Sequence, residues 1–584
     1  MLDQEIKPNE YSELRNMYKD TIDLYNTLYQ LKTKNEEDLN SIYKKIKTIL
    51  INSRTYSPKR IIRDILSIIE YNNRYMKSYL KLAKLIYDDY HVTKVKNAWD
   101  ISKYLFYKEY GIRIDYPSVC EYAPFSNLDI HEENSIYRII MDNDKESFIS
   151  YTAQEGFNKY RRIENFLFPI SIEGYTLLEL CCYYGSVDCF KFLRSEFNSV
   201  ITQQCLEVSF LGGNPEIISE CLKYKTPNKE CMKYAIISHN IDFVTFLINE
   251  YNIKIDLHFC IEYKNLESFL VYFDQTNNIN KCFLYSTNFN IPSLSEYFLS
   301  LGANINEKNM DGDEGTALQI AVTNNCKKLI NLLLSHGINV NEKNYYANTA
   351  LHIAVIFKRK EIIEQLISHG VNINEKDRRG RTSLHIAVGK NNNKIVDLLV
   401  SHCVNINEKD NDGDTALHIA AYKTKEIVEL LISHGANINE KDRHGRSALH
   451  IAASSFNKEI VELLISHGAN VHEKDNDGRT ALHIAASNIN KEITELLISH
   501  GANINEKDQW GSTALHIATC YGSKEIIELL LSHGANINEQ DIYGTTALHI
   551  AAENNCKETI ILLLSHGANG WHSMWFLKSL CWIN

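Results

Sequence analysis

The chain of 584 residues is 44% hydrophobic and 23% charged, and it carries a formal net charge of −11. These proportions are those of folded globular proteins, and the length exceeds what a single hydrophobic core ordinarily organises. The negative charge argues against a nucleic-acid-binding protein, and no apolar run approaches the roughly 18 residues of a membrane span. The N-terminus lacks the apolar region of a signal peptide, so we expect a cytoplasmic protein without an integral membrane segment.

Residues 1–128 are predicted to form an N-terminal helical domain that is rich in tyrosine. Amphipathic helices whose tyrosines edge a core are the simpler interpretation, and a surface that binds a peptide or a partner is the alternative. Pro58 precedes the clearest apolar face, at a position that favours a helix start. Because apolar residues recur at helical spacing, helices are expected over residues 10–32, 36–51, 58–71, 74–90 and 97–110.

Residues 129–305 are predicted to form six helix pairs with short connections. From Met232 onward the pairs recur about every 25 residues, and no Asp-x-x-Gly-x-Thr turn stands between them, so we expect no projecting hairpins. The apolar blocks that indicate the six pairs occupy residues 136–148, 177–193, 206–222, 232–248, 257–273 and 283–299.

Residues 306–570 repeat one sequence unit eight times, with starts 33 residues apart except for one step of 32. Each unit contains a turn, a Thr or Ser helix cap, two short helical patterns and a closing glycine such as Gly501. A fixed period in this range indicates stacked helix pairs that bury a core only together. The signature Thr-Ala-Leu-His-Ile-Ala begins at Thr349, Thr415, Thr480, Thr513 and Thr546, with variants at Thr316, Thr382 and Ser447.

These units resemble ankyrin repeats, whose pattern Thr-Pro-Leu-His-x-Ala is matched except that alanine replaces proline, as at Ala350, Ala481 and Ala547. The resemblance implies an all-α fold, an ankyrin-repeat solenoid of helix pairs with β-hairpin loops. It extends to residues 129–305 as degenerate ankyrin-like helix pairs. Residues 1–128 are similar to the uncharacterised helical domain that precedes ankyrin arrays in large protein families of unicellular eukaryotes.

Several positions depart from the repeat. The hairpin before Thr316 carries two extra residues, the unit from Asp410 is one residue short, and Cys403 replaces the glycine that ends a helix. Since a Cβ is strained in the left-handed conformation, Cys403→Gly is expected to stabilise that unit by about 1 kcal/mol. Residues 571–584 are an atypical aromatic tail, interpreted as an improvised cap, a frayed end or an atypical ending of the gene.

Fifteen of the 22 histidines occupy two repeat positions and are interpreted as scaffold. The Thr-Ala-Leu-His set, such as His483, is expected to hydrogen-bond turn backbone within and between units. The Ser-His-Gly set, such as His336, is expected to favour helix C-termini. No Cys or carboxylate accompanies them at ligand spacing, no nucleotide or nucleophile motif occurs, and the 14 cysteines are scattered. We therefore expect no catalytic residue, no metal and no cofactor.

Residues that vary between nearly identical units are the candidates for partner binding, because folding does not explain their variation. They gather at the hairpin tips and at the end of the first helix, positions that ankyrin proteins use on their concave side. Aromatic residues and arginine are also enriched in interface hot spots. Neutral drift of exposed loops is the competing interpretation. The candidates are Tyr345, Tyr346, Phe357, Arg378, Arg379, Arg381, Tyr422, Arg443, Arg446, Trp510, Tyr521 and Tyr543.

The leading functional hypothesis is a monomeric, non-enzymatic scaffold that binds another protein on the hairpin face of the repeats. The alternative is an adaptor whose N-terminal domain recruits separate machinery, such as a ubiquitin ligase or a membrane surface, while the repeats select the client. A catalytic N-terminal domain is a third hypothesis, with no motif in its favour.

Overall fold

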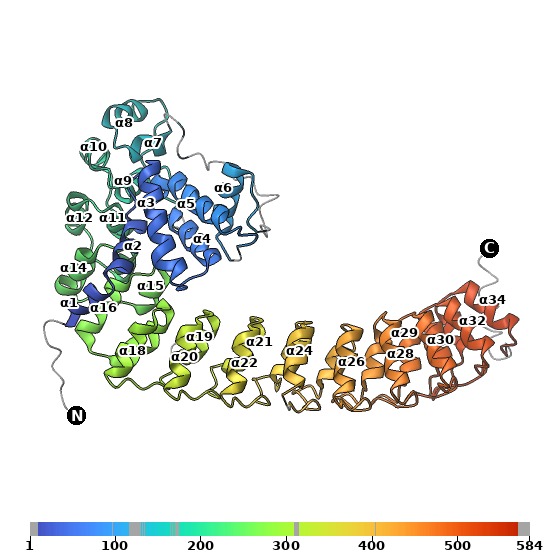
Figure 1. Cartoon of the computed structure of the whole chain (residues 1–584). Helices are drawn as coiled ribbons and strands as arrows, with labels where there is room; N and C mark the ends of the chain where they lie inside the picture. The colour runs from blue at the N-terminus through green and yellow to red at the C-terminus, as the bar shows by residue number, and fades with distance from the viewer. Residues whose placement is uncertain are drawn as a thin grey trace. The chain divides into compact units, whose positions relative to one another are not determined.

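The computed structural model describes residues 10–95, 97–115, 130, 132, 135–163, 165, 167–169, 174–308, 315–402 and 404–569. Its contacts divide the chain into two compact units, Met1–Glu307 and Lys308–Asn584 (Figure 1). The described residues form helices and two isolated β-bridges, with no strand among them, which confirms the all-α prediction. The finer division at residues 128 and 305 stays a prediction.

The N-terminal helices lie close to their predicted positions. The segment predicted over residues 10–32 divides at Tyr18, and two others end in a π or 3-10 turn. Ser57 caps α4 directly before Pro58, and Tyr25, Tyr29 and Tyr79 are buried, so tyrosines belong to the core. The elements are α1 (Glu10–Met17), α2 (Lys19–Tyr29), α3 (Glu36–Ile46), the π-helix η1 (Lys47–Asn52), α4 (Pro58–Ser67), the 3-10 helices η2 (Ile68–Glu70) and η3 (Asn73–Tyr75), α5 (Met76–Asp89) and α6 (Asp100–Tyr110).

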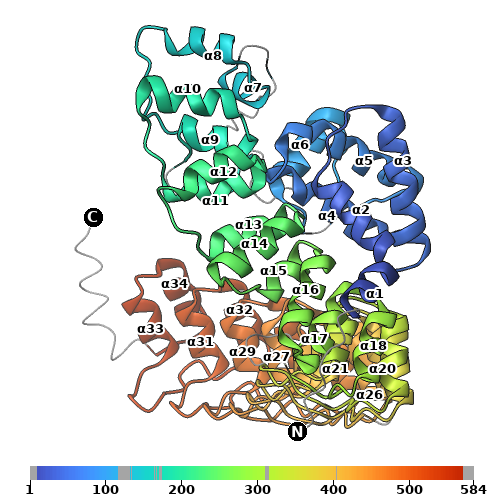
Figure 2. The ribbon, with the colours of Figure 1, turned by 90° about the vertical axis from the view of Figure 1, so that its left-hand side faces the viewer.

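The six helix pairs predicted before the repeats are all present. Each pair packs its apolar faces on the next, and Figures 1 and 2 both place the blue helices α2–α5 beside these green pairs. The pairs are α7 (Ile136–Met141) with α8 (Lys145–Thr152), α9 (Leu177–Tyr184) with α10 (Val187–Phe197), α11 (Gln203–Gly212) with α12 (Pro215–Leu222), α13 (Lys229–Ile237) with α14 (Ile241–Tyr251), α15 (Leu257–Glu262) with α16 (Leu266–Thr276), and α17 (Ile279–Ser286) with α18 (Pro292–Ser300), where the 3-10 helix η4 (Thr287–Phe289) follows α17.

The repeats form eight further pairs, which we call the array. They are α19 (Ala317–Thr323) with α20 (Lys327–Ser335), α21 (Ala350–Ile356) with α22 (Lys360–Ser368), α23 (Ser383–Gly389) with α24 (Asn393–Val400), α25 (Ala416–Ala420) with α26 (Lys425–Ser433), α27 (Ala448–Ser454) with α28 (Lys458–Ser466), α29 (Ala481–Ser487) with α30 (Lys491–Ser499), α31 (Ala514–Cys520) with α32 (Lys524–Ser532), and α33 (Ala547–Glu553) with α34 (Lys557–Ser565).

Each array repeat has two kinds of connection. A long loop with a tight turn, the hairpin tip, precedes the first helix, and these loops lie along the lower edge of the array in Figure 1. A short inter-helix turn joins the first helix to the second. This turn lies at the other end of the first helix from the hairpin tip, and a seven-residue helix is about 10 Å long. Gly501 adopts the expected left-handed conformation. Cys403, the extended hairpin at residues 309–314 and the tail 571–584 lie outside the described residues, so the predictions made for them stay predictions.

Candidate protein-interaction surfaces

The buried histidines of the first helices join one repeat to the next. In the repeat of His450, the Ser447 N–H donates to Nδ1 at 3.1 Å, and Nε2–H donates to the carbonyl of Arg479 in the following repeat at 3.1 Å. In the first repeat Gln319 makes the equivalent hydrogen bonds, because it accepts from the Thr316 N–H and donates to the Asn348 carbonyl of the next repeat. The expected scaffold role is confirmed by these bonds. Burial lowers the pKa of five of these side chains, those of His352, His385, His450, His483 and His516.

A second set of contacts runs along the long loops of the array. In six successive steps a lysine Nζ lies 2.7 Å from a glutamate of the next repeat and donates to a backbone carbonyl there, as Lys441 does to Glu473 and to Lys474. The ammonium group lowers the pKa of each glutamate. These lysines and glutamates therefore belong to the scaffold. The six pairs are Lys343–Glu375, Lys376–Glu408, Lys409–Glu440, Lys441–Glu473, Lys474–Glu506 and Lys507–Glu539.

The hairpin tips form a connected row. The backbone N–H at the start of one tip donates to a carbonyl of the preceding tip at 2.8–3.1 Å, as from Arg378 to Tyr346 and from Ile542 to Trp510. Within a tip, the Asp377 carboxylate accepts from the backbone N–H groups of Arg379 and Arg381. The tips are thus fixed in place by backbone bonds, and their outward side chains are held on a rigid support.

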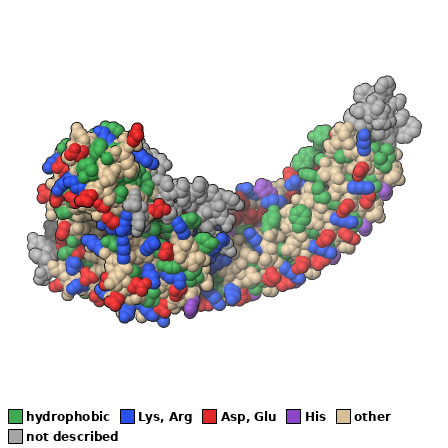
Figure 3. Space-filling model, turned by 90° about the horizontal axis from the view of Figure 1, so that it is seen from above, with side chains coloured by type: hydrophobic (Ala, Val, Ile, Leu, Met, Phe, Trp, Pro, Cys, Tyr) green, Lys and Arg blue, Asp and Glu red, His purple; other side chains and the backbone are tan. Residues whose placement is uncertain are grey.

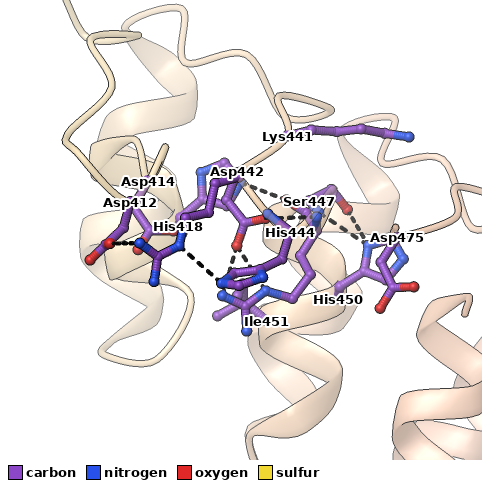
Figure 4. Close-up of polar contacts among 12 residues, drawn as sticks. Asp412, Asp414, His418, Lys441, Asp442, His444, Ser447, His450, Ile451 and Asp475 are labelled. Carbon is purple, nitrogen blue, oxygen red and sulfur yellow. Dashed lines mark hydrogen bonds and ion pairs between the residues drawn. The ribbon is translucent and has the colours of Figure 1, made fainter. Parts of the chain in front are cut away.

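Two of the predicted arginines are used by their own hairpins. Arg381 donates to Asp377 through Nε and Nη2, at 3.0 and 2.7 Å, and Arg446 makes the same pair with Asp442 at 2.8 and 2.7 Å. Arg443 is exposed and pairs with Asp412 of the preceding tip at 2.5 Å (Figure 4). Part of the arginine variation at the tips is therefore explained by hairpin stability.

The aromatic candidates at the tips are exposed. Tyr345 and Tyr346 meet edge to face with ring centroids 5.3 Å apart, and the Arg378 guanidinium lies over the Tyr345 ring at 4.7 Å. Arg379 is exposed beside them. Trp510 and Tyr543 occupy equivalent tips further along the array and are also exposed. These side chains form the exposed part of the predicted site, in contrast to the arginines that pair with the aspartates of their own hairpins.

The remaining candidates, Phe357, Tyr422 and Tyr521, lie at the inter-helix turns, so the predicted residues form two separate rows. Sequence reasoning missed two further exposed apolar residues in this second row, Phe456 and Ile489. Counting from the cap Thr480, Ile489 stands where a polar residue is the rule, and that offset would have identified it. In Figure 3 hydrophobic side chains lie along the array as separate patches among charged ones.

A cavity of ≈ 300 Å³ opens where the shortened repeat meets the next. Its walls include Ile419, Tyr422 and Ile451, with Asp414 and Arg446 at its polar side. The first helix of this repeat, α25, has five residues where α27 has seven. The single-residue deletion seen in the sequence thus leaves space beside Tyr422.

No group of three His, Cys, Asp or Glu side chains in the described part of the chain is placed to hold a metal ion. None of the helices described for the chain combines the length and the hydropathy needed to cross a bilayer.

The comparisons with known proteins agree with this geometry. The family model described as ankyrin repeats, in three copies, matches residues 283–377, 361–442, 435–508 and 501–573. This chain is an ankyrin-repeat protein. The match begins within α17, so the last pair before the array is already ankyrin-like. Ankyrin repeats are a general protein–protein interaction module and are typically non-enzymatic, and protein binding is the general function that the family gives.

The other comparisons add less. A model described as a domain of unknown function matches residues 197–272, which precede the array but follow residue 128. The ankyrin repeat domain of Bcl-3, described as a unique member of the IkappaB protein family, is similar at 28% identity and a TM-score of 0.35. That similarity covers 37% of this chain and 98% of that one. No curated protein matches the chain.

Proposed function

We propose that this ankyrin-repeat protein is a non-enzymatic scaffold that binds a partner protein on the hairpin face of its array. The observation that carries the proposal is the exposure of aromatic side chains at equivalent, rigidly held tips. Trp510 is 41% exposed and Tyr543 is 77% exposed, although neither is needed to close its hairpin. Large aromatic residues on a preorganised support lose little entropy on binding, which is why they serve as hot spots.

The tip residues also differ in chemistry along the row, which suits recognition of one partner rather than nonspecific adhesion. Tyr345, Tyr346 and Arg378 form an aromatic and cationic cluster at one place, whereas Trp510 and Tyr543 are apolar and lie further along. Binding at the cluster is expected to weaken with salt, and binding at Trp510 is expected to be insensitive to it.

The test replaces Trp510 and Tyr543 together by alanine in the full chain. Partners are captured from an extract of the source cells with wild-type protein, and the affinity of the strongest is then measured for both forms. We expect unchanged unfolding and binding weakened about 30-fold, the equivalent of about 2 kcal/mol. Ile561→Ala, an exposed apolar change on α34, is the matched control. Equal affinity of the double variant and wild type would remove the tips as the recognition surface.

The adaptor hypothesis is the alternative form of the same proposal. Residues 10–115 pack against the following pairs within one unit, for example through Arg74 Nη2, which donates to the Tyr184 carbonyl at 3.0 Å. A truncated chain would therefore expose buried surface. The sharper test changes the exposed Met17 and Tyr107 to serine in the full chain. Loss of one set of captured proteins while tip-dependent partners remain would favour the adaptor.

A further inference from the structure

The first unit shows what an inter-helix turn can bind, because its turns are covered by the N-terminal helices. At the α9–α10 turn, Tyr183 donates its hydroxyl to the Glu70 carbonyl at 2.9 Å, and Tyr184 donates to Asn73 Oδ1 at 2.8 Å. At the α17–α18 turn, the Tyr56 hydroxyl donates to the Phe289 carbonyl at 2.8 Å. These contacts fall at the end of the first helix of a pair or between its two helices.

One helix of the N-terminal segment, α2, runs along three successive turns. Tyr18, at its start, donates to Ser293 in the first turn of α18 at 3.4 Å. Asn26 donates to Glu267, the second residue of α16, at 3.2 Å. Gln30, at its end, donates to the carbonyl of His239 at the α13–α14 turn at 2.8 Å. The row of turns therefore offers a track on which an α-helix lies lengthwise.

Two kinds of contact occur along this track. An apolar or aromatic side chain packs on the turn, as Tyr29 stacks on His239 with ring centroids 4.2 Å apart. A cationic or amide side chain binds the acidic residue at the second position of the following helix, as Arg15 and Asn26 bind Glu267. Glu267 is buried beneath this cover.

Four consecutive repeats of the array carry the same pair of features without a cover. An exposed apolar or aromatic side chain stands at or directly before the turn, and an exposed glutamate occupies the second position of the next helix, as Glu267 does in α16. We call these residues the turn row. They are Tyr422 with Glu426, Phe456 with Glu459, Ile489 with Glu492, and Tyr521 with Glu525.

Folding explains the glutamates of the turn row but not the exposed apolar side chains of Phe456 and Ile489. A glutamate near a helix N-terminus favours the helix dipole, which accounts for the acidic member of each pair. Nothing of that kind accounts for Phe456, which is 81% exposed. Ile489 is 53% exposed and has a φ of +55°, a conformation that a β-branched residue adopts only under strain. The equivalent residues Asn325, Asn391 and Asn555 adopt it without that strain.

We propose that the turn row binds an α-helix of a partner protein, lying lengthwise across the four repeats. The helix would present apolar or aromatic side chains to the turns and arginine or lysine to the glutamates. Since stacked helix pairs lie roughly 8–10 Å apart and a helix rises roughly 1.5 Å per residue, the contact residues of the bound helix recur about every five to seven positions. The proposal rests on the protein-binding function and identifies the class of partner.

The test uses the full chain and two displayed peptide libraries of equal length. One places apolar residues at seven-residue intervals among Arg, Lys and helix formers, and the other is identical but for a proline in the middle of each interval. We expect the first library alone to give binders. These should weaken about tenfold or more in Phe456→Ser and in Ile489→Asn, with unfolding unchanged or, for Ile489→Asn, improved. Glu459→Gln with Glu492→Gln should weaken binding and reduce its dependence on salt.

The outcomes separate this proposal from the broader one. Binders that are equally frequent in the proline library, or that are indifferent to Phe456→Ser and Ile489→Asn, overturn the helix-binding turn row. If such binders instead depend on Trp510 and Tyr543, the hairpin face remains a protein-binding surface and only this inference fails. Binders lost on change of the turn row but kept in the Trp510→Ala, Tyr543→Ala variant support it.

Discussion

In the array each helix pair is joined to the next by polar contacts that recur with the repeat, whereas the pairs of residues 136–300 are braced by helices from outside the stack. His450 and Lys441 bind backbone of the following repeat. In the first unit, Arg74 and Tyr56 reach the turns from the N-terminal segment. A contact similar to the histidine bonds of the array occurs in the first unit, where Glu179 accepts hydrogen bonds from the Thr176 N–H and from the Thr202 hydroxyl of the following helix pair.

The difference teaches that a helix pair with a short connection and no hairpin needs stabilisation from elsewhere. The array obtains it from within, through residues that every repeat carries, and it leaves its turns open to solvent. The first unit obtains it from outside, and its turns are occupied. The same position in the pair, the inter-helix turn, therefore contacts the N-terminal helices in the first unit and is exposed in the array.

The largest effect is expected from lowering the pH, which should destabilise the array before the first unit. The five buried histidines have folded pKa values lowered by burial, so the unfolded chain takes up protons first as pH falls. Their stabilisation is complete above about pH 6.5 and decreases below it. At pH 5.5 the loss is at most about 1.4 kcal/mol for each histidine that stays uncharged.

Urea unfolding at pH 7.5 and 5.5 measures this loss, and limited proteolysis identifies the unit that opens. His239 in the first unit, whose pKa burial lowers to about 4, acts in the same direction, but among the described residues of that unit it is the one histidine with such a shift. The comparison fails if the first unit loses as much stability as the array between these pH values.

A single break in the histidine link is the next largest effect. His450→Ala removes an acceptor from Ser447 and a donor to Arg479 and leaves a void in the core, so we expect a loss of about 3 kcal/mol. His450→Gln is the matched control, because Gln319 makes the equivalent bonds in the first repeat. Hydrogen exchange of α27 and α29 reports the local loss. Equal losses in the two variants would refute the hydrogen-bond explanation.

The brace of the first unit is tested by Asn73→Ala. Asn73 is fully buried, donates to the Leu167 carbonyl at 2.8 Å and accepts from the Tyr184 hydroxyl at 2.8 Å. Leaving both groups unpaired is expected to cost about 2 kcal/mol in the first unit and nothing in the array. Urea unfolding with unit-specific proteolysis distinguishes the two. Destabilisation of the array by the same amount would show that the units do not unfold separately.

The smallest effect is expected from the lysine ladder. Lys441→Met removes the contact with Glu473 and the bond to the Lys474 carbonyl, but the lysine side chain is 43% exposed, so the loss should stay below about 1 kcal/mol. The loss of stability should be smaller still in about 1 M salt, where surface charges are screened. A loss that salt leaves unchanged would assign the effect to the carbonyl bond instead of the ion pair.

The fold could be predicted from the sequence because apolar spacing and capping residues are local signals. The six irregular pairs and the cap at Thr480 were visible without any long-range information. The division of the first helix at Tyr18 was not predicted, and the Tyr18 hydroxyl contacts Ser293, which is far away in the sequence. These local signals are those of helices, which is why the all-α fold could be predicted correctly.

The candidate site could be predicted only in part. Variation between repeats pointed to exposed residues, but it did not show that Arg381 and Arg446 are bound to the aspartates of their own hairpins. It also did not separate tips from turns, because both follow the same period. Phe456 and Ile489 were missed although Ile489 stands at a repeat position where a polar residue is the rule, and their exposure and the covered turns of the first unit then singled them out.

The ladder of identical contacts has a consequence for how such a chain changes over generations. From the second repeat to the seventh, each repeat offers its successor the same histidine donor, and six successive steps share the same lysine and glutamate. Deleting or duplicating one of these units therefore creates a junction at which the histidine and lysine partners already match. Recombination within the gene can thus lengthen or shorten the array by complete units, and each such event also moves a new set of tip and turn residues into register with its neighbours.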